Sequence, residues 1–367
     1  MRIAIDVRSL MEGRFSGVEE YTKNIIRSLV AEASQHQWSI FYNAYRAVHV
    51  PTFAGVAVDT FSYPNKLFTL SQAVARYPRW DSLIKADCWF MPNMGLLPLS
   101  STAPYVVVAH DLSYERFPQF YSWRHRTWHR MVRPRQLMHG ATHVIADSAS
   151  TAQDVTGLYD IASDKVTVVH PGVPDAVPGS SVARVRTKYD LPERFVLYFG
   201  THEPRKNIPS IVAAFSAVAQ DIPHHLVIAG SPGWKMGEID QAITTAEAQD
   251  RIHRIGFVEP ADKMELYAAA DLFVYPSFYE GFGFPPLEAL LAGTPVITSH
   301  NSSLPEVVGE WATLIDPYNP AELAAVMREL ALDPPVVTDE DKRSIRQQYS
   351  WRESARRITD IIEAAVV

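Results

Sequence analysis

Short apolar segments alternate with helical patterns along almost the entire chain. The strand-like segments are residues 2–7, 38–42, 56–61, 87–91, 105–109 and 143–146 in the first part, and 195–199, 226–229, 252–257, 272–275 and 295–298 in the second. Between several of them, apolar residues recur at helical spacing, as at Tyr21, Ile25 and Leu29. This alternation is typical of the α/β class, in which helices cover both faces of a parallel sheet.

Proline and glycine cluster where the alternation is interrupted, between residues 171 and 192. We expect a linker in this segment. The sequence therefore predicts two Rossmann-like domains, residues 1–175 and residues 190–350. Because ligands of open α/β sheets bind at the carboxyl ends of the strands, we expect the binding site in a cleft between these domains.

The charge balance and the cysteine content exclude several classes of protein. Lys and Arg total 34 against 41 Asp and Glu, a formal charge of −7, whereas broad nucleic-acid binding needs a basic surface. The single cysteine, Cys88, excludes an intramolecular disulfide and a cysteine-rich metal site, and we expect it to be a buried apolar side chain. The uncharged residues 88–110 include Pro92 and Pro98, which is atypical of a membrane span. With no signal-peptide pattern at the start, we expect an intracellular, cytoplasmic protein.

The segment from Glu280 to Glu288 is the most informative motif. It reads EGFGFPPLE, follows the strand-like residues 272–275, and begins a helical pattern that ends at Gly293. Its glycines allow a ligand close to the backbone, and amides at a helix N-terminus favour an anion. We expect both carboxylates to face one pocket. The alternative is a tight turn in which Glu288 only complements the helix dipole.

Three further positions lie beside strand-like segments. Arg205 and Lys206 follow residues 195–199. The arginine can bind a diphosphate through two parallel hydrogen bonds, and the lysine through a compact single charge. The alternative is a solvated basic turn. Gly17 ends a glycine-containing loop before a helical pattern, where backbone amides can bind phosphate. His110 follows residues 105–109, at the edge of the sheet where sites form. Gly17 and His110 can equally be structural.

Taken together in this order, these segments resemble the family 4 retaining glycosyltransferases of the GT-B fold. The Glu280–Glu288 pair matches that family's E-x7-E signature, and residues 200–207 resemble its donor-diphosphate loop. The segments IDVRSL, SGVEEYTKNI and AHDLSYERFP resemble bacterial mannosyltransferases and related enzymes of polysaccharide assembly. The resemblance covers nearly the whole chain and implies that the last helix, about residues 351–367, crosses back to the first domain.

The resemblance also implies a role for each site residue. Arg205 and Lys206 would bind the donor diphosphate and stabilise it as the leaving group. Glu280 would hold the transferred sugar, and Glu288 the ribose. The remaining implied contacts are the main-chain amides of Phe282, Gly283 and Phe284 beside the sugar, Gly17 near the diphosphate, Val258 near the base, and His110 at the reaction centre. One departure concerns the first loop, where many relatives carry a second glycine and this chain has Val18.

The expected reaction is transfer of mannose from GDP-mannose to a glycan or a lipid-linked saccharide, with retention and without a metal or other cofactor. The only DxD tripeptide, Asp339-Glu340-Asp341, follows no strand-like segment, so we expect a solvated helix start there. Arg205 and Lys206 would take the place of the metal. Alternative donors are UDP-glucose, UDP-N-acetylglucosamine and a dTDP-deoxysugar. An alternative of another class is a catalytically silent nucleotide-sugar-binding subunit, which the presence of the site residues disfavours.

Residues 114–135 interleave aromatic and basic side chains. The aromatic residues are Tyr114, Phe117, Phe120, Tyr121, Trp123 and Trp128, and the arginines are Arg116, Arg124, Arg126, Arg130, Arg133 and Arg135. Along one helix, this composition suits an anionic membrane surface, here the inner face of the membrane, or the pyrophosphate of a lipid-linked acceptor. The alternative is a solvated helix that packs its aromatic residues inward.

Overall fold

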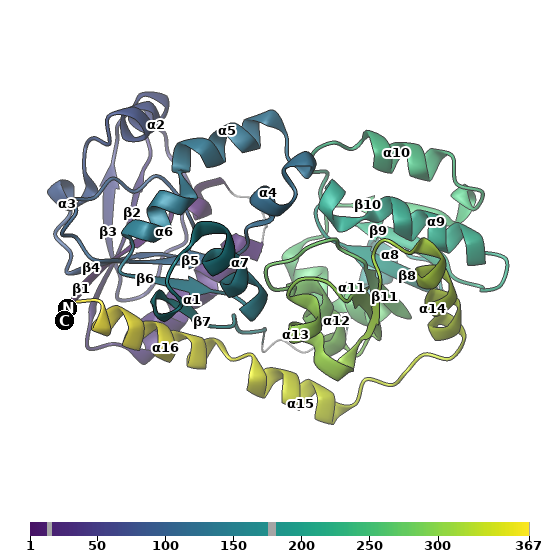
Figure 1. Ribbon diagram of the computed structural model, residues 1–367. Coiled ribbons are helices and arrows are strands. Elements are labelled where there is room, and N and C mark those ends of the chain that lie inside the picture. Colours follow the sequence, from purple (N-terminus) through teal and green to yellow (C-terminus); the bar gives the residue numbers. More distant parts are fainter. Residues whose placement is uncertain (13–16, 175–180, 367) are drawn as a thin grey trace. The chain divides into compact units, whose positions relative to one another are not determined.

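The computed structural model describes residues 1–12, 17–174 and 181–366 of the chain (Figure 1). The chain divides into two compact units. The first unit contains Met1–Gly172 and Tyr349–Val367, and the second contains Val173–Gln348.

A seven-stranded parallel sheet forms the centre of the first unit, in the order β3-β2-β1-β4-β5-β6-β7. Its strands are β1 (Arg2–Asp6), β2 (Gln37–Asn43), β3 (Ala57–Phe61), β4 (Cys88–Met91), β5 (Tyr105–Ala109), β6 (His143–Ala146) and β7 (Val166–Val168). Its helices are α1 (Gly17–Glu32), α2 (Asn65–Val74), α3 (Trp80–Leu83), α4 (Ser113–Arg116), α5 (Trp123–Val132), α6 (Pro134–Gly140), α7 (Ala149–Tyr159) and α16 (Trp351–Ala364).

Two apolar cores cover the two faces of this sheet, because successive side chains of a strand point to opposite faces. Ile3 and Ile5 of β1 belong to the core that includes residues of α1 and α16. Ala4, between them, belongs to the core built with α2, α3, α6 and α7. Cys88 is fully buried in the first of these cores, as expected, and burial raises the pKa of its thiol to about 12.

The helix α16 returns to the first unit and completes its core, which confirms this part of the expected fold. Ile358 and Ile362 are fully buried beside Ile25 of α1. Ser354 Oγ donates a hydrogen bond of 2.6 Å to the carbonyl of His170. A Cβ atom on Gly172 would lie 2.2 Å from the backbone nitrogen of Trp351, so only glycine fits where the chain leaves this unit.

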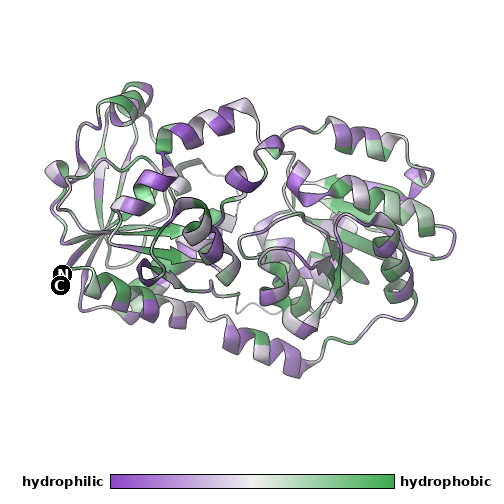
Figure 2. Cartoon of the chain, in the orientation of Figure 1, coloured by the Kyte–Doolittle hydropathy of each residue, from purple (hydrophilic) through white to green (hydrophobic). Residues whose placement is uncertain are grey.

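A six-stranded parallel sheet forms the centre of the second unit, in the order β10-β9-β8-β11-β12-β13. Its strands are β8 (Phe195–Phe199), β9 (His225–Ala229), β10 (Ile252–Gly256), β11 (Leu272–Tyr275), β12 (Val296–Ser299) and β13 (Thr313–Ile315). Its helices are α8 (Val182–Lys188), α9 (Ile208–Val218), α10 (Gly237–Thr244), α11 (Lys263–Ala269), α12 (Phe284–Ala292), α13 (Leu304–Val308), α14 (Pro320–Leu332) and α15 (Asp339–Gln348). Figure 2 shows apolar strands within both units and helices with a polar side.

The structure differs from the sequence analysis at three places. The expected linker, residues 171–192, includes helix α8, and this helix packs against α11. The strands β7 and β13 were not expected, because three residues are too few to show a pattern. Residues 114–135 do not form one helix: Pro118 begins a short 3₁₀ helix and Pro134 begins α6, since proline cannot continue a helix. Among the described residues, no helix is both long and apolar enough to cross a membrane.

Candidate functional site

The two strongest sequence motifs of the second unit lie at one edge of its sheet. The segment with Arg205 and Lys206 follows β8, and the segment from Glu280 follows β11. These two strands are parallel neighbours, so the loops after them begin at the same edge. The sequence order of the strands also reverses here, because β8 lies between β9 and β11, and such a reversal is where ligands bind in open α/β sheets.

The carboxylate of Glu280 lies between both basic side chains. Lys206 Nζ donates to Glu280 Oε1 at 2.6 Å, and Arg205 Nη1 donates to Glu280 Oε2 at 2.8 Å. A second carboxylate, Glu203, accepts from Arg205 Nη2 at 2.7 Å. We call these four residues the ion cluster. Glu203, Lys206 and Glu280 are all buried, which is unusual for charged side chains unless they are paired.

Tyr275, the last residue of β11, is the other neighbour of Lys206. The ammonium of Lys206 donates to the hydroxyl of Tyr275 at 2.6 Å and lies 5.0 Å from the centre of the Tyr275 ring. An ammonium has three N–H donors, and these contacts with Tyr275 and Glu280 occupy two of them. The cluster therefore holds a lysine in a fixed position with a donor left for an anionic ligand.

The charges of the cluster depend on one another. Burial acts to raise the pKa of Glu280, but Arg205 and Lys206 outweigh it and hold this pKa at about 2. Burial, assisted by the neighbouring Arg205, lowers the pKa of Lys206. Glu280 is therefore an anion over the whole neutral range, and it balances part of the positive charge at the edge of the sheet.

Serine hydroxyls fix the backbone that carries Glu280. Ser302 Oγ accepts from the Glu280 amide at 2.8 Å, and Ser303 Oγ donates to the carbonyls of Glu280 and Phe282 at 3.0 and 2.7 Å. Gly283 has φ +119°, which L side chains rarely adopt, and it leads directly into α12. The glycine after Phe282 is thus required by the turn that begins the helix.

Glu288 lies in α12, eight residues after Glu280, and has a separate set of partners. Its carboxylate accepts from Lys263 Nζ at 2.5 Å and from the Tyr267 hydroxyl at 3.0 Å, both on α11. The side chain is buried. Glu280 and Glu288 therefore both hold cations, but different ones, and the expectation that they share one pocket stays a prediction.

The other expected donor contacts lie in the loops of the same unit. Val258 is buried just after β10. Phe282 is buried, and its ring lies 5.2 Å from that of Phe284 in an edge-to-face arrangement. Sequence reasoning did not identify Glu203, Tyr275, Lys263 or Tyr267 as site residues. Two of them had a signal: Glu203 lies inside the segment 200–207, and Tyr275 is the last residue of a strand.

His110 of the first unit is paired with a buried carboxylate. It follows β5, and Asp147 follows the neighbouring strand β6, in which Ala146 is in register with Ala109. His110 Nδ1 lies 2.6 Å from Asp147 Oδ2, and the ring of Tyr21 stands edge-on at 4.8 Å. Burial opposes protonation, but Asp147 outweighs it and raises the pKa of His110. His110 Nε2 is buried and has no side-chain partner among the described residues, while the backbone of Pro92 also favours the protonated ring.

A polar cavity opens at the carboxyl ends of β1, β2 and β4. It measures about 310 Å³. Asp6, Arg8 and Asn43 line it together with Trp128 of α5, and Arg8 Nη2 lies 2.6 Å from Asp6 Oδ2. Such a set of carboxylate, guanidinium and amide groups suits a ligand rich in hydroxyls.

Two further expectations concern the first loop and the DxD tripeptide. Gly17 begins α1, but the rest of its loop, residues 13–16, lies outside the described residues. Asp339 begins α15, where Asp339 and Glu340 are exposed and Asp341 accepts hydrogen bonds from Thr338, as expected for a solvated helix start. No cluster of three or more metal-ligating side chains occurs among residues 1–12, 17–174 and 181–366.

Two protein-family models match this chain. The model for Glycosyltransferase Family 4 matches residues 15–177, and the model for Glycosyl transferases group 1 matches residues 182–351. Among curated proteins, the chain is 30% identical to O-antigen chain mannosyltransferase B of Escherichia coli over 67% of this chain and 66% of that protein. It is 26% identical to the serotype-specific mannosyltransferase WbdA of Escherichia coli, over 97% of this chain and 47% of that protein. The chain thus spans just under two thirds of one relative and about half of the other.

Solved structures share the fold at low sequence identity. Sucrose-phosphate synthase from Thermosynechococcus elongatus has a TM-score of 0.77 at 18% identity and covers 99% of this chain and 98% of its own. Anabaena Alr3699/HepE in complex with UDP-glucose has a TM-score of 0.74 at 18% identity, covering 99% of this chain and 100% of its own. The likeness extends over both units.

We predict that Glu280→Gln destabilises the second unit in a pH-dependent way. Removing one partner of a buried ion cluster leaves uncompensated charge, at a cost of about 3–5 kcal/mol. The folded-state pKa of about 2 lies below the ordinary value of 4.5, so Glu280 contributes stability above about pH 4.5 and loses it as the pH falls toward 2. Urea unfolding should show that the free energy of unfolding differs between wild type and variant by a constant amount from pH 7 to 5. Below pH 5 this difference should become smaller.

The exposed pair of Glu259 with Lys188 provides the control. Glu259→Gln should change the free energy of unfolding by less than about 1 kcal/mol at neutral pH. If the difference in free energy of unfolding between wild type and Glu280→Gln stays constant down to pH 3, the ion cluster does not depress the pKa of Glu280.

Proposed function

The chain belongs to glycosyltransferase family 4 and has the GT-B fold, and on this premise we propose that it transfers mannose from GDP-mannose, with retention, to a glycan or lipid-linked saccharide. The observation that carries the proposal is the ion cluster, which presents two fixed cations at the carboxyl ends of β8 and β11. The printed names of both Escherichia coli relatives, mannosyltransferases, support mannose as the transferred sugar.

The ion cluster suits the departure of a nucleoside diphosphate. Transfer breaks the bond between the anomeric carbon and the diphosphate oxygen, and that oxygen keeps the electron pair. Lys206 and Arg205 stabilise the developing charge, and because Glu280 and Glu203 already hold them in position, little reorganisation is needed during the reaction. A diphosphate oxygen accepts the proton of the attacking hydroxyl, so the chain need not supply a nucleophile.

Two glutamates divide the remaining donor contacts. Glu288, fixed by Lys263 and Tyr267, accepts hydrogen bonds from the ribose hydroxyls. Glu280 positions both cations and contacts the sugar, together with the amides of residues 282–284. Because Glu280 also holds Arg205 and Lys206 in position, we expect its loss to disturb the diphosphate site as well as the sugar site.

The first unit supplies the contacts for the acceptor and the reaction centre. We propose that His110, held in place by Asp147, acts at the reaction centre. The polar cavity lined by Asp6, Arg8 and Asn43 binds the acceptor saccharide, because its groups form hydrogen bonds with hydroxyls.

Helix α5 is a candidate contact with an anionic membrane surface. Trp123 and Trp128 are exposed by 71% and 42% of their surface. Arg124, Arg126 and Arg130 are exposed on the same helix, and basic and aromatic side chains on one helix suit the membrane interface. We propose that the enzyme is cytoplasmic and associates peripherally with the inner face of the membrane through this helix.

We predict that GDP stabilises the protein more than UDP, ADP or dTDP does. A nucleotide at one hundred times its Kd adds about 2.7 kcal/mol, or roughly 5–10 °C in Tm for a unit of this size. Thermal unfolding with each nucleotide measures this, and Glu288→Ala should reduce the shift because the ribose contact is lost. A response to UDP or dTDP alone would support the alternative donors, and a response to none would contradict nucleotide-sugar transfer.

We predict that transfer continues in excess EDTA. The charge of the leaving diphosphate is stabilised by Arg205 and Lys206, and the DxD tripeptide lies on the exposed start of α15. A transfer assay with and without EDTA measures this, and Asp341→Ala should leave the rate unchanged. Loss of activity with rescue by Mn²⁺ or Mg²⁺ would contradict the proposal.

We predict that Lys206→Ala lowers turnover by about 10²–10³ and weakens donor binding much less. Its charge matters most in the transition state, when the diphosphate departs. Calorimetric titration with the donor and a transfer assay separate the two effects. The matched control is Arg328→Ala, which removes a cation paired with Asp221 on the surface. Equal loss in binding and turnover would show that Lys206 acts by binding alone.

A further inference from the structure

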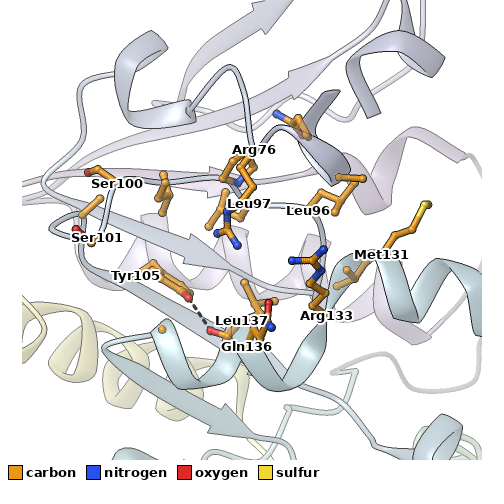
Figure 3. Close-up of a pocket in the computed structure, with 17 residues that line it drawn as sticks. Arg76, Leu96, Leu97, Ser100, Ser101, Tyr105, Met131, Arg133, Gln136 and Leu137 are labelled. Atoms are coloured by element: carbon orange, nitrogen blue, oxygen red, sulfur yellow. Dashed lines mark hydrogen bonds between the residues drawn. The ribbon is translucent and has the colours of Figure 1, made fainter. Parts of the chain in front are cut away.

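A second cavity of the first unit contains two arginines and no acidic residue. It measures about 230 Å³. It is lined by the end of α2 with Arg76 after it, residues 96–101 and 103, Tyr105 of β5, and the junction of α5 and α6. Figure 3 shows Arg76 and Arg133 extending their guanidinium groups into it from different elements. No Asp or Glu belongs to the described residues that line it, so its net charge is positive.

The two guanidinium groups lack a counter-ion among residues 1–12, 17–174 and 181–366. Arg76 and Arg133 form no ion pair among the residues that the structure describes, whereas Arg8 and Arg116 of the same unit are paired with Asp6 and Asp154. Both side chains are exposed, and they line the same cavity. Each guanidinium fork matches a pair of phosphate oxygens. The cavity is therefore suited to an anion that the chain does not itself provide.

A buried amide points to a ligand independently of the arginines. Gln72 is 2% exposed and lines this cavity as well as the polar cavity. Its Oε1 accepts from Arg8 Nη1 at 3.5 Å, but its Nε2 donor is buried and has no partner among the described residues. A buried donor without an acceptor is costly, so a small shift of this side chain toward an acceptor supplied by a ligand in either cavity would be favourable.

The rest of the lining is apolar with hydroxyl groups. Leu96, Leu97 and Met131 contribute apolar surface, and Ser100 and Ser101 contribute hydroxyls (Figure 3). We propose that this cavity binds a phosphate ester between Arg76 and Arg133. The ligand is either a small phosphate ester or the phosphate headgroup of a lipid, whose apolar part would lie against the leucines. The proposal does not depend on the transfer reaction, because it uses no residue of the ion cluster.

The backbone of both arginines offers variants that should fold. Arg76 and Arg133 have φ of 51° and 55°, in the left-handed region that glycine adopts without strain. Arg76→Gly and Arg133→Gly therefore remove one cation each and relax the backbone. Each should retain the thermal stability of the wild type, so that a loss of binding is not a loss of folding.

Two probes with one headgroup distinguish the sources of phosphate. Glycerol 3-phosphate carries the phosphate ester alone, and dihexanoyl phosphatidic acid carries the same group on two short apolar chains. Calorimetric titration of wild type should show binding of one or both. Each glycine variant should weaken binding at least about tenfold, the equivalent of one charged hydrogen bond. Tighter binding of the lipid identifies a headgroup, and equal binding identifies a small ester.

Two controls keep the phosphate from being assigned to the wrong site. Arg27→Ser removes an exposed arginine of α1 outside this cavity and should leave the affinity unchanged. Lys206→Ala removes a cation of the ion cluster and should also leave it unchanged. Equal affinity of the wild type and both glycine variants for the two probes, or a loss confined to Lys206→Ala, would overturn the proposal.

Discussion

The carboxylate of Glu280 between Arg205 and Lys206 is the interaction on which the second unit's site depends. It connects a loop after β8 with a loop after β11, and it neutralises charge that would otherwise lie buried side by side. A buried ion cluster is seldom the most stabilising solution, since apolar residues of similar volume can be as stable. The cluster is better understood as a means of holding two cations ready at the edge of a sheet.

A similar arrangement occurs at the ends of β5 and β6 in the first unit. Asp147 follows β6 and fixes His110 after β5, just as Glu280 after β11 fixes Lys206 after β8. In each case neighbouring strands in a parallel sheet bring together polar residues that are distant in sequence. The sheet of the first unit supplies this precision because both of its faces are covered by apolar side chains.

Much of this arrangement could be predicted from the sequence, and the remainder depends on packing. The alternation of strands and helices predicted the α/β class, and strand ends predicted where Arg205, Glu280 and His110 would lie. The pairing of Glu288 with Lys263 and Tyr267 could not be predicted, because it depends on how α11 packs against α12. Asp147 could have been predicted from its position, because it directly follows the next strand after that of His110. The residues around it in the sequence form no motif that indicates a site. The cavity of Arg76 and Arg133 joins segments with no common pattern.

The return of α16 to the first unit has a consequence for the order of synthesis. The apolar face formed by β1 and α1 is completed by Ile358 and Ile362, and the whole of Val173–Gln348 is translated before them. At roughly 5–20 residues per second, that interval lasts about 9–35 s. During this time the part of the first unit that has already been synthesised exposes an unfinished core. Chaperones that bind apolar surface would therefore meet the amino-terminal part of this chain first and release it last.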